Sequence, residues 1–372
     1  MGIVIQSYGE EHIPGVRDFN RRLLAGGAPE HLVFPEHPVP LWLPKIDGAR
    51  VYNEYFLALE GGAVRGTYAL KRQACYIAGE PRSVGFYHHP LSEGVVDRGY
   101  ATVGATLLRG ALKDEPVMYA LGMEGYDRPL PRMLKAMGWS DLLVPFYFRV
   151  VRPARFLRAM QWLRGLAARR LLMDAAAFSG AGWLAIKTAQ GMRTLGSPSQ
   201  RDVSVEEVPE FARWADPLWE RARALYAMTA VRDSESLRTL YPAANRKFTR
   251  LKVSRDGVAI GWAVVAEQKK KPRYGDLRVG CVLDCFADPA DGTPVVQAAV
   301  RALERRGMDL IVSNQSHAGW GDGFRRSGFL TGPSNFIFAA SKSLAGLLAP
   351  FEEKGRLIHV TRADGDGLYQ YV

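Results

Sequence analysis

The sequence contains little cysteine and no apolar segment long enough to cross a membrane. Three cysteines occur among 372 residues, at positions 75, 281 and 285. So few and so widely spaced cysteines exclude a secreted disulfide scaffold and favour a reducing compartment. The longest apolar stretch, residues 175–186, is interrupted by a serine and two glycines, whereas a membrane-spanning helix needs about 20 apolar residues. Because the first residues also show no export signal, we expect a cytoplasmic protein without a transmembrane helix.

Acidic residues are nearly missing from one part of the chain. Residues 152–193 hold seven arginines and one lysine but a single acid, Asp174, and they carry most of the formal net charge of +11. The chain as a whole has ordinary globular composition, with 47% hydrophobic and 23% charged residues, which excludes disordered and collagen-like proteins. At roughly 150 residues per domain, the length predicts about two domains.

Two segments far apart in the chain share one pattern. Residues 55–70 alternate in polarity around a Gly-Gly pair, and residues 249–265 alternate around an Asp-Gly pair. Alternating runs joined by such pairs predict β-hairpins. A strand pattern and a helical pattern precede each hairpin, within residues 3–24 in the first half and 202–226 in the second. The two halves therefore begin with the same order of elements.

Glycines fall at matching places in the two halves. Gly66 and Gly261 occupy the second strand of each hairpin, and Gly138 and Gly328, each followed by an aromatic residue, end a short helical pattern further along. The same order of elements with similar spacing indicates an internal duplication of a large α+β unit rather than a short-repeat solenoid.

The duplication divides the chain into four predicted segments. Apolar residues at helical spacing in the basic segment predict one or two amphipathic helices that join the halves. The last residues predict a closing hairpin across Asp364–Gly367. The segments are an N-terminal domain at 1–151, a basic helical linker at 152–195, a C-terminal domain at 196–345 and a C-terminal hairpin tail at 346–372.

The element order of each half resembles the GNAT acetyltransferase fold, and two copies in one chain resemble the tandem layout of the Fem-type peptidyl transferases. The resemblance implies an α+β fold with two tandem GNAT-like domains, in which mixed central sheets are flanked by helices and a basic helical linker joins the domains. It also implies an acyltransferase that moves an acyl group to an amine acceptor. Acetyl-CoA or another acyl-CoA would be the donor substrate.

The most specific mark of the GNAT family is a loop of the form Gln/Arg-x-x-Gly-x-Gly/Ala after the fourth strand, which holds the pyrophosphate of acyl-CoA. Amide donors and the dipole at a helix N-terminus attract an anion, and glycine allows close approach. Gly104 matches the last glycine of the motif, whereas Thr102 replaces the first one and Gly99 replaces the Gln/Arg, with Arg98 one position earlier. The resemblance implies a CoA-binding loop at Arg98, Gly99, Thr102, Val103 and Gly104. The alternative is a loop that only covers the core.

The corresponding loop of the second half lacks the motif. Residues 287–296 contain no Gly-x-Gly and carry Asp288 and Asp291. Because these carboxylates would repel a pyrophosphate, we expect any CoA in the first half.

Amine acylation needs a base, which GNAT proteins often carry on or just after the fourth strand. His89 titrates near neutrality and Glu93 would act through a water molecule. His88 would face the opposite side of the strand from His89, so that at most one of them faces the cleft. Tyr126, with Glu124 beside it, replaces the tyrosine that the family uses as an acid. The candidate catalytic residues are Glu93, His89 and Tyr126, and the alternative for each histidine is a surface or packing role.

Two further groups of polar residues occur in the second half. One group follows the strand pattern at 309–313 and would line a polar pocket for an acceptor, or else form an ordinary loop; it comprises Asn314, Gln315, Ser316, His317 and Trp320. Cys281, Asp284 and Cys285 have metal-like spacing but lie within one strand pattern with no nearby histidine. We interpret the cysteines as small buried residues and predict no metal site.

The acceptor is expected to be a small-molecule or lipid-linked amine, with no specific nucleic acid. A Fem-like transferase that uses aminoacyl-tRNA on a cell-envelope precursor, and a non-catalytic GNAT-fold binding protein, are the alternatives. The basic linker either packs between the domains or makes a peripheral membrane contact. The residues for that contact are Arg155, Arg158, Arg169 and Arg170.

Overall fold

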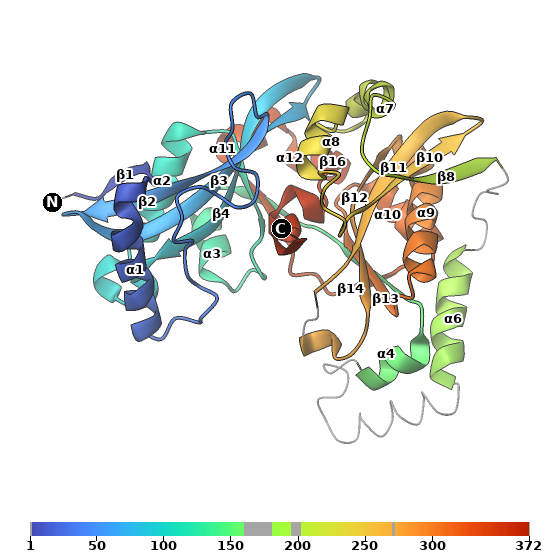
Figure 1. Ribbon diagram of the computed structural model, residues 1–372, viewed down its shortest axis with the longest axis horizontal. Helices are drawn as coiled ribbons and strands as arrows, with labels where there is room; N and C mark the ends of the chain where they lie inside the picture. The colour runs from blue at the N-terminus through green and yellow to red at the C-terminus, as the bar shows by residue number, and fades with distance from the viewer. Residues whose placement is uncertain (1, 160–180, 195–201, 270–271, 372) are drawn as a thin grey trace. The chain divides into compact units, whose positions relative to one another are not determined.

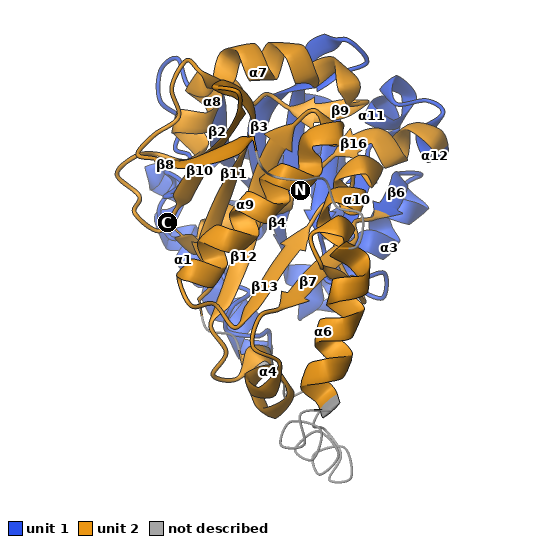
Figure 2. Ribbon diagram, turned by 90° about the vertical axis from the view of Figure 1, so that its right-hand side faces the viewer, with its two compact units in different colours: residues 1–142, 337–352, 372 blue, residues 143–336, 353–371 orange. Residues whose placement is uncertain are grey.

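The computed structural model describes residues 2–159, 181–194, 202–269 and 272–371. They form two compact units (Figure 2), Met1–Leu142 with Ile337–Glu352, and Leu143–Phe336 with Glu353–Tyr371. We call them unit 1 and unit 2. Each contains a mixed β-sheet flanked by helices (Figure 1), which confirms the predicted α+β fold with two tandem domains built on mixed central sheets.

Unit 1 is built on a sheet with the strand order β1-β2-β3-β4-β5-β15-β6. Its central pair, β4 and β5, is parallel, and β1, β2 and β3 pair in antiparallel fashion with their neighbours. The strands are β1 (Val4–Ser7), β2 (Val51–Glu60), β3 (Ala63–Ile77), β4 (Glu80–Ser92), β5 (Met118–Gly122), β6 (Ser140–Leu143) and β15 (Ile337–Ala340). The helices are α1 (Ile13–Ala25), α2 (Val103–Asp114), α3 (Pro129–Ala136) and α11 (Lys342–Leu347), with 3-10 turns η1 (Glu10–His12), η2 (Glu93–Val95) and η3 (Arg98–Tyr100).

Unit 2 repeats this plan with the strand order β8-β10-β11-β12-β13-β7-β14. The strands of this sheet are β7 (Phe146–Val150), β8 (Val203–Val208), β10 (Thr249–Arg255), β11 (Val258–Glu267), β12 (Val279–Ala287), β13 (Leu310–Asn314) and β14 (Leu330–Gly332). Two short strands of unit 2, β9 (Met228–Ala230) and β16 (Ile358–His359), lie outside this sheet and pair with each other. The helices are α4 (Pro153–Ala159), α6 (Ala181–Thr194), α7 (Ala215–Ala222), α8 (Ser234–Leu240), α9 (Gly292–Arg305) and α10 (Ala318–Arg326), and α12 (Phe351–Lys354) lies where the two units join along the chain. The 3-10 turns are η5 (Arg223–Leu225), η6 (Pro272–Tyr274), η7 (Pro289–Asp291), η8 (Gly355–Leu357), η9 (Arg362–Asp364) and η10 (Asp366–Tyr371).

The two halves exchange one strand. β15, from the second half of the sequence, lies between β5 and β6 in unit 1, and β7, from the first half, lies between β13 and β14 in unit 2. The units are therefore not the contiguous ranges 1–151 and 196–345 that the sequence predicted. Strand pairing over such distances leaves no local signal in the sequence.

Glycine is required for the same structural reason at the matching positions of the two halves. A Cβ on Gly66 would lie 2.8 Å from the Val103 side chain of α2, and one on Gly261 would lie 2.8 Å from the Ala287 side chain. Both hairpins thus need glycine where neighbouring elements pack closely. Gly138 and Gly328 both have φ of 78° and end α3 and α10, as a left-handed C-terminal cap requires.

The sheet of unit 1 separates two apolar cores. Tyr55, Leu57 and Ala69 pack with α1 on one face, whereas Phe56 and Tyr68 pack with α2 and α3 on the other. This alternation follows from the two-residue period of β-strands.

The tail does not form the predicted hairpin. β16 pairs in parallel with β9, and the residues after it form the 3-10 turns η9 and η10. The buried carboxylate of Asp364 closes a capping box on Thr361, so this segment bonds locally instead of pairing as strands.

The linker is helical at both described ends, α4 and α6. Across the described ranges, no helix is both long and apolar enough to span a bilayer.

Candidate functional site

Strands β4 and β5 pair over only a short length. The register joins Gly85 to Met118 and Phe86 to Tyr119, and β4 then continues to Ser92. Backbone groups of β4 beyond Phe86 have no partner in β5, and such unpaired groups are a template for another extended chain. We refer to this region as the β4–β5 gap.

The chain leaves the gap through an exposed loop that leads into α2. Ser92 caps η2 by accepting from the Gly94 amide, and Asp97 caps η3 by accepting from the Gly99 amide. Arg98, Gly99 and Thr102 are exposed. These turns place the N-terminus of α2 at the surface, beside the end of β4.

The N-terminus of α2 is open. The Thr102 side chain does not cap it, so the first amides of the helix keep their N–H groups available. A Cβ on Gly104 would have only the Met133 sulfur within 4 Å, at 3.8 Å. The helix dipole and these donors favour an anion here, and Arg98 adds a positive charge nearby in the loop.

The corresponding helix of unit 2, α9, is covered at its N-terminus. A Cβ on Gly323 of α10 would lie 3.1 Å from the Thr293 nitrogen, and Gly292 lies against the Trp320 ring. Asp291, beside this N-terminus, pairs with Arg255 at 2.8 Å. Of these two equivalent helices, α2 therefore has the open N-terminus.

Glu93 lies buried between two arginines. Its carboxylate accepts from Arg22 Nε at 2.7 Å and from Arg65 Nη1 at 3.0 Å. Burial raises the pKa of Glu93, but the two guanidinium groups outweigh it and hold the pKa below its ordinary value. Because Arg22 belongs to α1 and Arg65 to β3, this arrangement ties η2 to the rest of unit 1 and makes Glu93 a poor proton acceptor.

A β-bulge places both histidines of β4 on the α1 face of the sheet. The pairing register shifts between Thr67 and Ala69, and His89 has a φ of 50°. The His89 ring lies 5.6 Å from Phe34, and the His88 ring lies 6.3 Å from Trp42. We expected these residues to face opposite sides; the bulge breaks the alternation on which that expectation rested.

His88 is oriented by a hydrogen bond with Asn53. Its Nε2 lies 3.0 Å from Asn53 Oδ1, and the Asn53 amide donates to the Trp42 carbonyl at 2.8 Å. This orientation of Asn53 assigns the proton to Nε2 and leaves Nδ1 as the acceptor nitrogen. Burial lowers the pKa of His88 well below its ordinary value, and the charges of His89 and Lys71 lower it further. His88 stands two positions beyond Phe86, where the β4–β5 gap begins.

Tyr126 lies on the other face of the sheet. It lines a small cavity with Leu134 and Trp139, which belong to the α2–α3 core. Its hydroxyl donates to Asp141 at 2.6 Å, and burial and then this carboxylate raise the pKa of Tyr126 to about 12. Glu124 pairs with Arg128 at the surface. The sheet thus separates Tyr126 from His89 and Glu93.

The polar residues after β13 are mostly interior. Gln315 accepts from the His317 amide, His317 caps α10, and Trp320 donates to the Tyr226 hydroxyl at 2.8 Å. Ser316 bonds to the backbone of β16 and Val360. Among this group only Asn314 lines a described pocket. Cys281 and Cys285 are buried, and Asp284 accepts from Arg232.

Asn53 and Trp42, which orient His88, are not among the site residues predicted from the sequence. Val51, Asn53 and Tyr55 are two residues apart along one strand, so their side chains share a face that is otherwise apolar. A single amide side chain on this face was the sequence feature that could have identified Asn53.

The linker arginines are placed only in part. Arg155 Nη1 lies 3.0 Å from the buried carboxylate of Asp309, which also accepts from Arg152. Arg158 lies in α4, and Arg169 and Arg170 fall outside the described residues. Arg155 therefore has a structural partner within unit 2.

No protein-family model matches the sequence, and a search of curated proteins finds no match. Solved structures share the fold, including the following two. A probable N-acyltransferase from Enterococcus faecalis V583 has a TM-score of 0.50 and 8% identity over 94% of this chain and 75% of that one. Saccharomyces cerevisiae N-myristoyltransferase with bound myristoyl-CoA and inhibitors has a TM-score of 0.50 and 10% identity over 91% of this chain and 79% of that one.

Proposed function

We propose that the protein is an acyltransferase that takes an acyl group from acyl-CoA and passes it to an amine. The open N-terminus of α2 beside the β4–β5 gap carries this proposal, since the equivalent helix among the described residues of unit 2, α9, is covered at its N-terminus. The fold shared with a probable N-acyltransferase and with N-myristoyltransferase supports it.

The proposed donor site matches the chemistry of CoA in two parts. The pyrophosphate would accept from the first amides of α2, with Arg98 supplying charge. The pantetheine arm, which contains two amides, would pair with the backbone of β4 beyond Phe86. The thioester would then lie along β4, toward His88.

His88 is the base we propose. The amine nitrogen attacks the thioester carbon, the C–S bond breaks, and Nδ1 of the neutral imidazole takes the proton that the amine loses. The imidazolium then returns this proton to the leaving thiolate of CoA. A histidine whose pKa lies below neutrality is unprotonated at pH 7 and therefore ready to accept. Glu93 is a poorer proton acceptor because its carboxylate is paired with two arginines.

The donor site is tested by calorimetric titration of CoA into Gly104→Glu. The new carboxylate would stand at the anion site, so CoA affinity should fall by at least about tenfold. Gly346→Glu, at an exposed helical glycine with open space around it, is the matched control and should bind as the wild type does. Equal affinity of all three proteins would remove this loop from the proposal.

A non-catalytic binding protein is the second candidate. The separation of Tyr126 from the histidines by the sheet, and the pairing of Glu93 with two arginines, both favour it. It predicts that acyl-CoA binds at α2 but that no amine in a broad panel is acylated, whereas the acyltransferase releases free CoA with at least one amine.

A further inference from the structure

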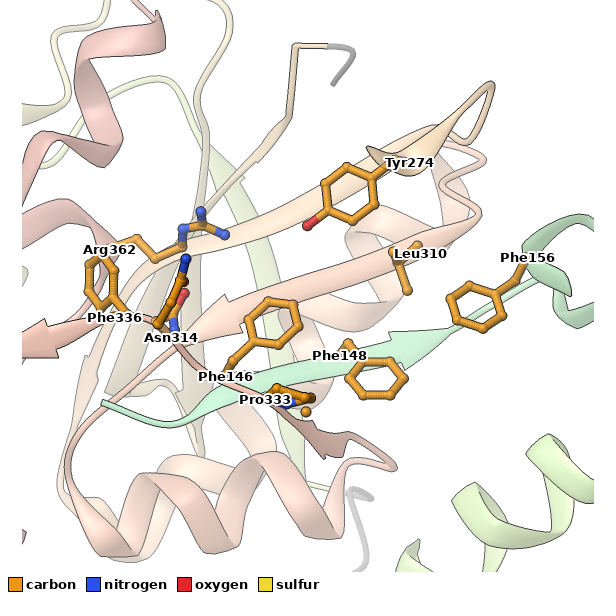
Figure 3. A pocket seen from close by; sticks show the side chains of 11 residues that line it. Phe146, Phe148, Phe156, Tyr274, Leu310, Asn314, Pro333, Phe336 and Arg362 are labelled. Carbon is orange, nitrogen blue, oxygen red and sulfur yellow. The ribbon is translucent and has the colours of Figure 1, made fainter. Parts of the chain in front are cut away.

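Unit 2 contains a pocket that the proposed donor site does not use. Its volume is about 410 Å³, within the range of pockets that hold small organic ligands. Side chains from β7, β13, α4, η6, η9 and the segment after β14 line it (Figure 3). All of these elements belong to unit 2.

One end of the pocket is apolar. Phe146 and Phe148 stack at a centroid distance of 6.1 Å, and Phe156 of α4 stacks on Phe148 at 6.5 Å. Leu310 lies on the neighbouring strand on the same side of the pocket as these rings (Figure 3). Phe146 and Phe148 are only half-buried although β7 is paired with a strand on each side. An apolar group placed here would remove their rings from water.

The other end carries a positive charge, and the Phe336 ring also lies there (Figure 3). Arg362 and Asn314 lie side by side at this end, as Figure 3 shows. Arg362 Nη1 is buried, and within the described part of the chain it has no hydrogen-bond partner. Asn314 is buried, and its Nδ2 donates to the Pro145 carbonyl at 3.3 Å. The Arg362 guanidinium also forms a hydrogen bond with the Cys281 side chain, but the remaining Nη1 donor is costly to bury unless a ligand supplies an acceptor.

Hydrogen bonds on both sides of Arg362 hold its backbone in place. Thr361 and Asp364 close the capping box of η9 around it, and Asp364 also accepts two hydrogen bonds from Arg232. Thr361 donates to Asp284 at 3.1 Å. Asp364, the nearest carboxylate along the chain, therefore already accepts hydrogen bonds from Arg232. The Arg362 guanidinium lies at the end of the pocket. Such pre-organisation lowers the entropic cost of binding.

We propose that this pocket binds a monocarboxylate that carries an apolar chain or ring. The carboxylate would accept from Arg362, whose planar guanidinium matches two carboxylate oxygens, and the apolar part would lie against Phe146, Phe148 and Phe156. A single guanidinium suits one negative charge better than a phosphate dianion, which recruits several donors. The proposal is independent of the donor site at α2, so either can fail without the other.

The test is isothermal titration calorimetry of the full-length protein with three probes. Octanoate has both the charge and the chain, octan-1-ol has only the chain, and butanoate has the charge on a short chain. We expect octanoate to bind one-to-one and both other probes to bind at least about tenfold more weakly, because each loses one of the two contacts. These wild-type comparisons do not depend on any variant folding.

Arg362→Met removes the charge and keeps much of the side-chain volume. It should weaken octanoate about tenfold to a hundredfold, as loss of a charged hydrogen bond does, and leave octan-1-ol unchanged. Arg356→Met, at an exposed arginine of the same tail, should change neither. The proposal is overturned if octanoate does not bind, if octan-1-ol or butanoate binds as tightly as octanoate, or if a folded Arg362→Met protein binds octanoate as the wild type does.

Discussion

The Arg232 guanidinium donates to both carboxylate oxygens of Asp364, at 3.0 and 2.9 Å. The same guanidinium reaches Asp284 on β12 at 3.1 Å, and Tyr241 donates to that carboxylate at 2.8 Å. Arg232 and Asp284 are 1% exposed and Asp364 is 5% exposed. The tail is thus attached to the central strand of unit 2 by a buried charge network.

Arg232→Met should destabilise unit 2 strongly. The substitution leaves two carboxylates buried without their cation, and breaking a buried pair in this way costs about 3–5 kcal/mol. Urea denaturation at pH 7 measures the loss. Arg221→Met, at an exposed arginine of α7, should change the free energy of unfolding by no more than about 0.5 kcal/mol. Similar stabilities of the two variants would contradict the assigned role of the network.

Stability should fall as the solution becomes acidic. Burial lowers the pKa of His317 to about 4 and that of His359 well below its ordinary value. The unfolded chain therefore binds protons near pH 6.5 that the folded chain does not, so stability is fully present above pH 6.5 and is lost as the pH falls toward 4. His317 alone contributes on the order of 2 kcal/mol between pH 7 and pH 5.

Urea unfolding of His317→Gln at several pH values tests this assignment. The variant should lose part of the pH dependence that the wild type shows between pH 7 and pH 5. His37→Gln, at an exposed histidine, should keep the wild-type slope. Equal slopes in all three proteins would show that the buried imidazole is not the titrating group.

His88 and Glu93 should respond differently to substitution. His88→Ala should lower the rate of CoA release with an accepted amine by about 10²–10⁴, the usual contribution of a general base, while CoA affinity stays the same. Glu93→Gln should instead cost about 1–3 kcal/mol of stability, because two arginines lose a charged acceptor, and should retain transfer below its melting temperature. The reverse pattern would make Glu93 the base.

Residues 1–151 should not fold alone. This fragment contains β7, whose partners β13 and β14 are in unit 2, and lacks β15, which separates β5 from β6. Its sheet would have two unpaired edges, a condition that promotes aggregation. Circular dichroism and thermal unfolding of the purified fragment measure the outcome, and a cooperative transition from a monomer would contradict the importance of the exchanged strand.

The hairpins and the repeat were predictable because their signals are local. Gly-Gly and Asp-Gly turns between alternating runs specify hairpins, and Gly138 and Gly328 mark helix ends at equivalent places. The helical pattern predicted within 202–226 forms only a short helix, Ala215–Ala222, followed by η5. Pro209 has no amide hydrogen for a helical bond, and Pro217 fits only the first turn of α7.

The strand exchange and the site geometry were not predictable from one sequence. The alternation of Phe146–Val150 would suit either sheet, and nothing local selects β13 as its partner. The orientation of His88 depends on Asn53, which lies in another strand, and on a bulge that local alternation conceals. Asn314 and Arg362 both line the pocket of unit 2. No sequence motif predicts that these two residues lie close together.

Amide hydrogen exchange most directly tests whether CoA binds at the N-terminus of α2. The first amides of a helix have no intrahelical acceptor and exchange quickly in the free protein. With saturating CoA, exchange should slow at residues 99–106 and along β4 beyond Phe86, and should stay unchanged at residues 289–296 of unit 2. CoA that leaves residues 99–106 unprotected, or that protects 289–296 instead, would contradict the account.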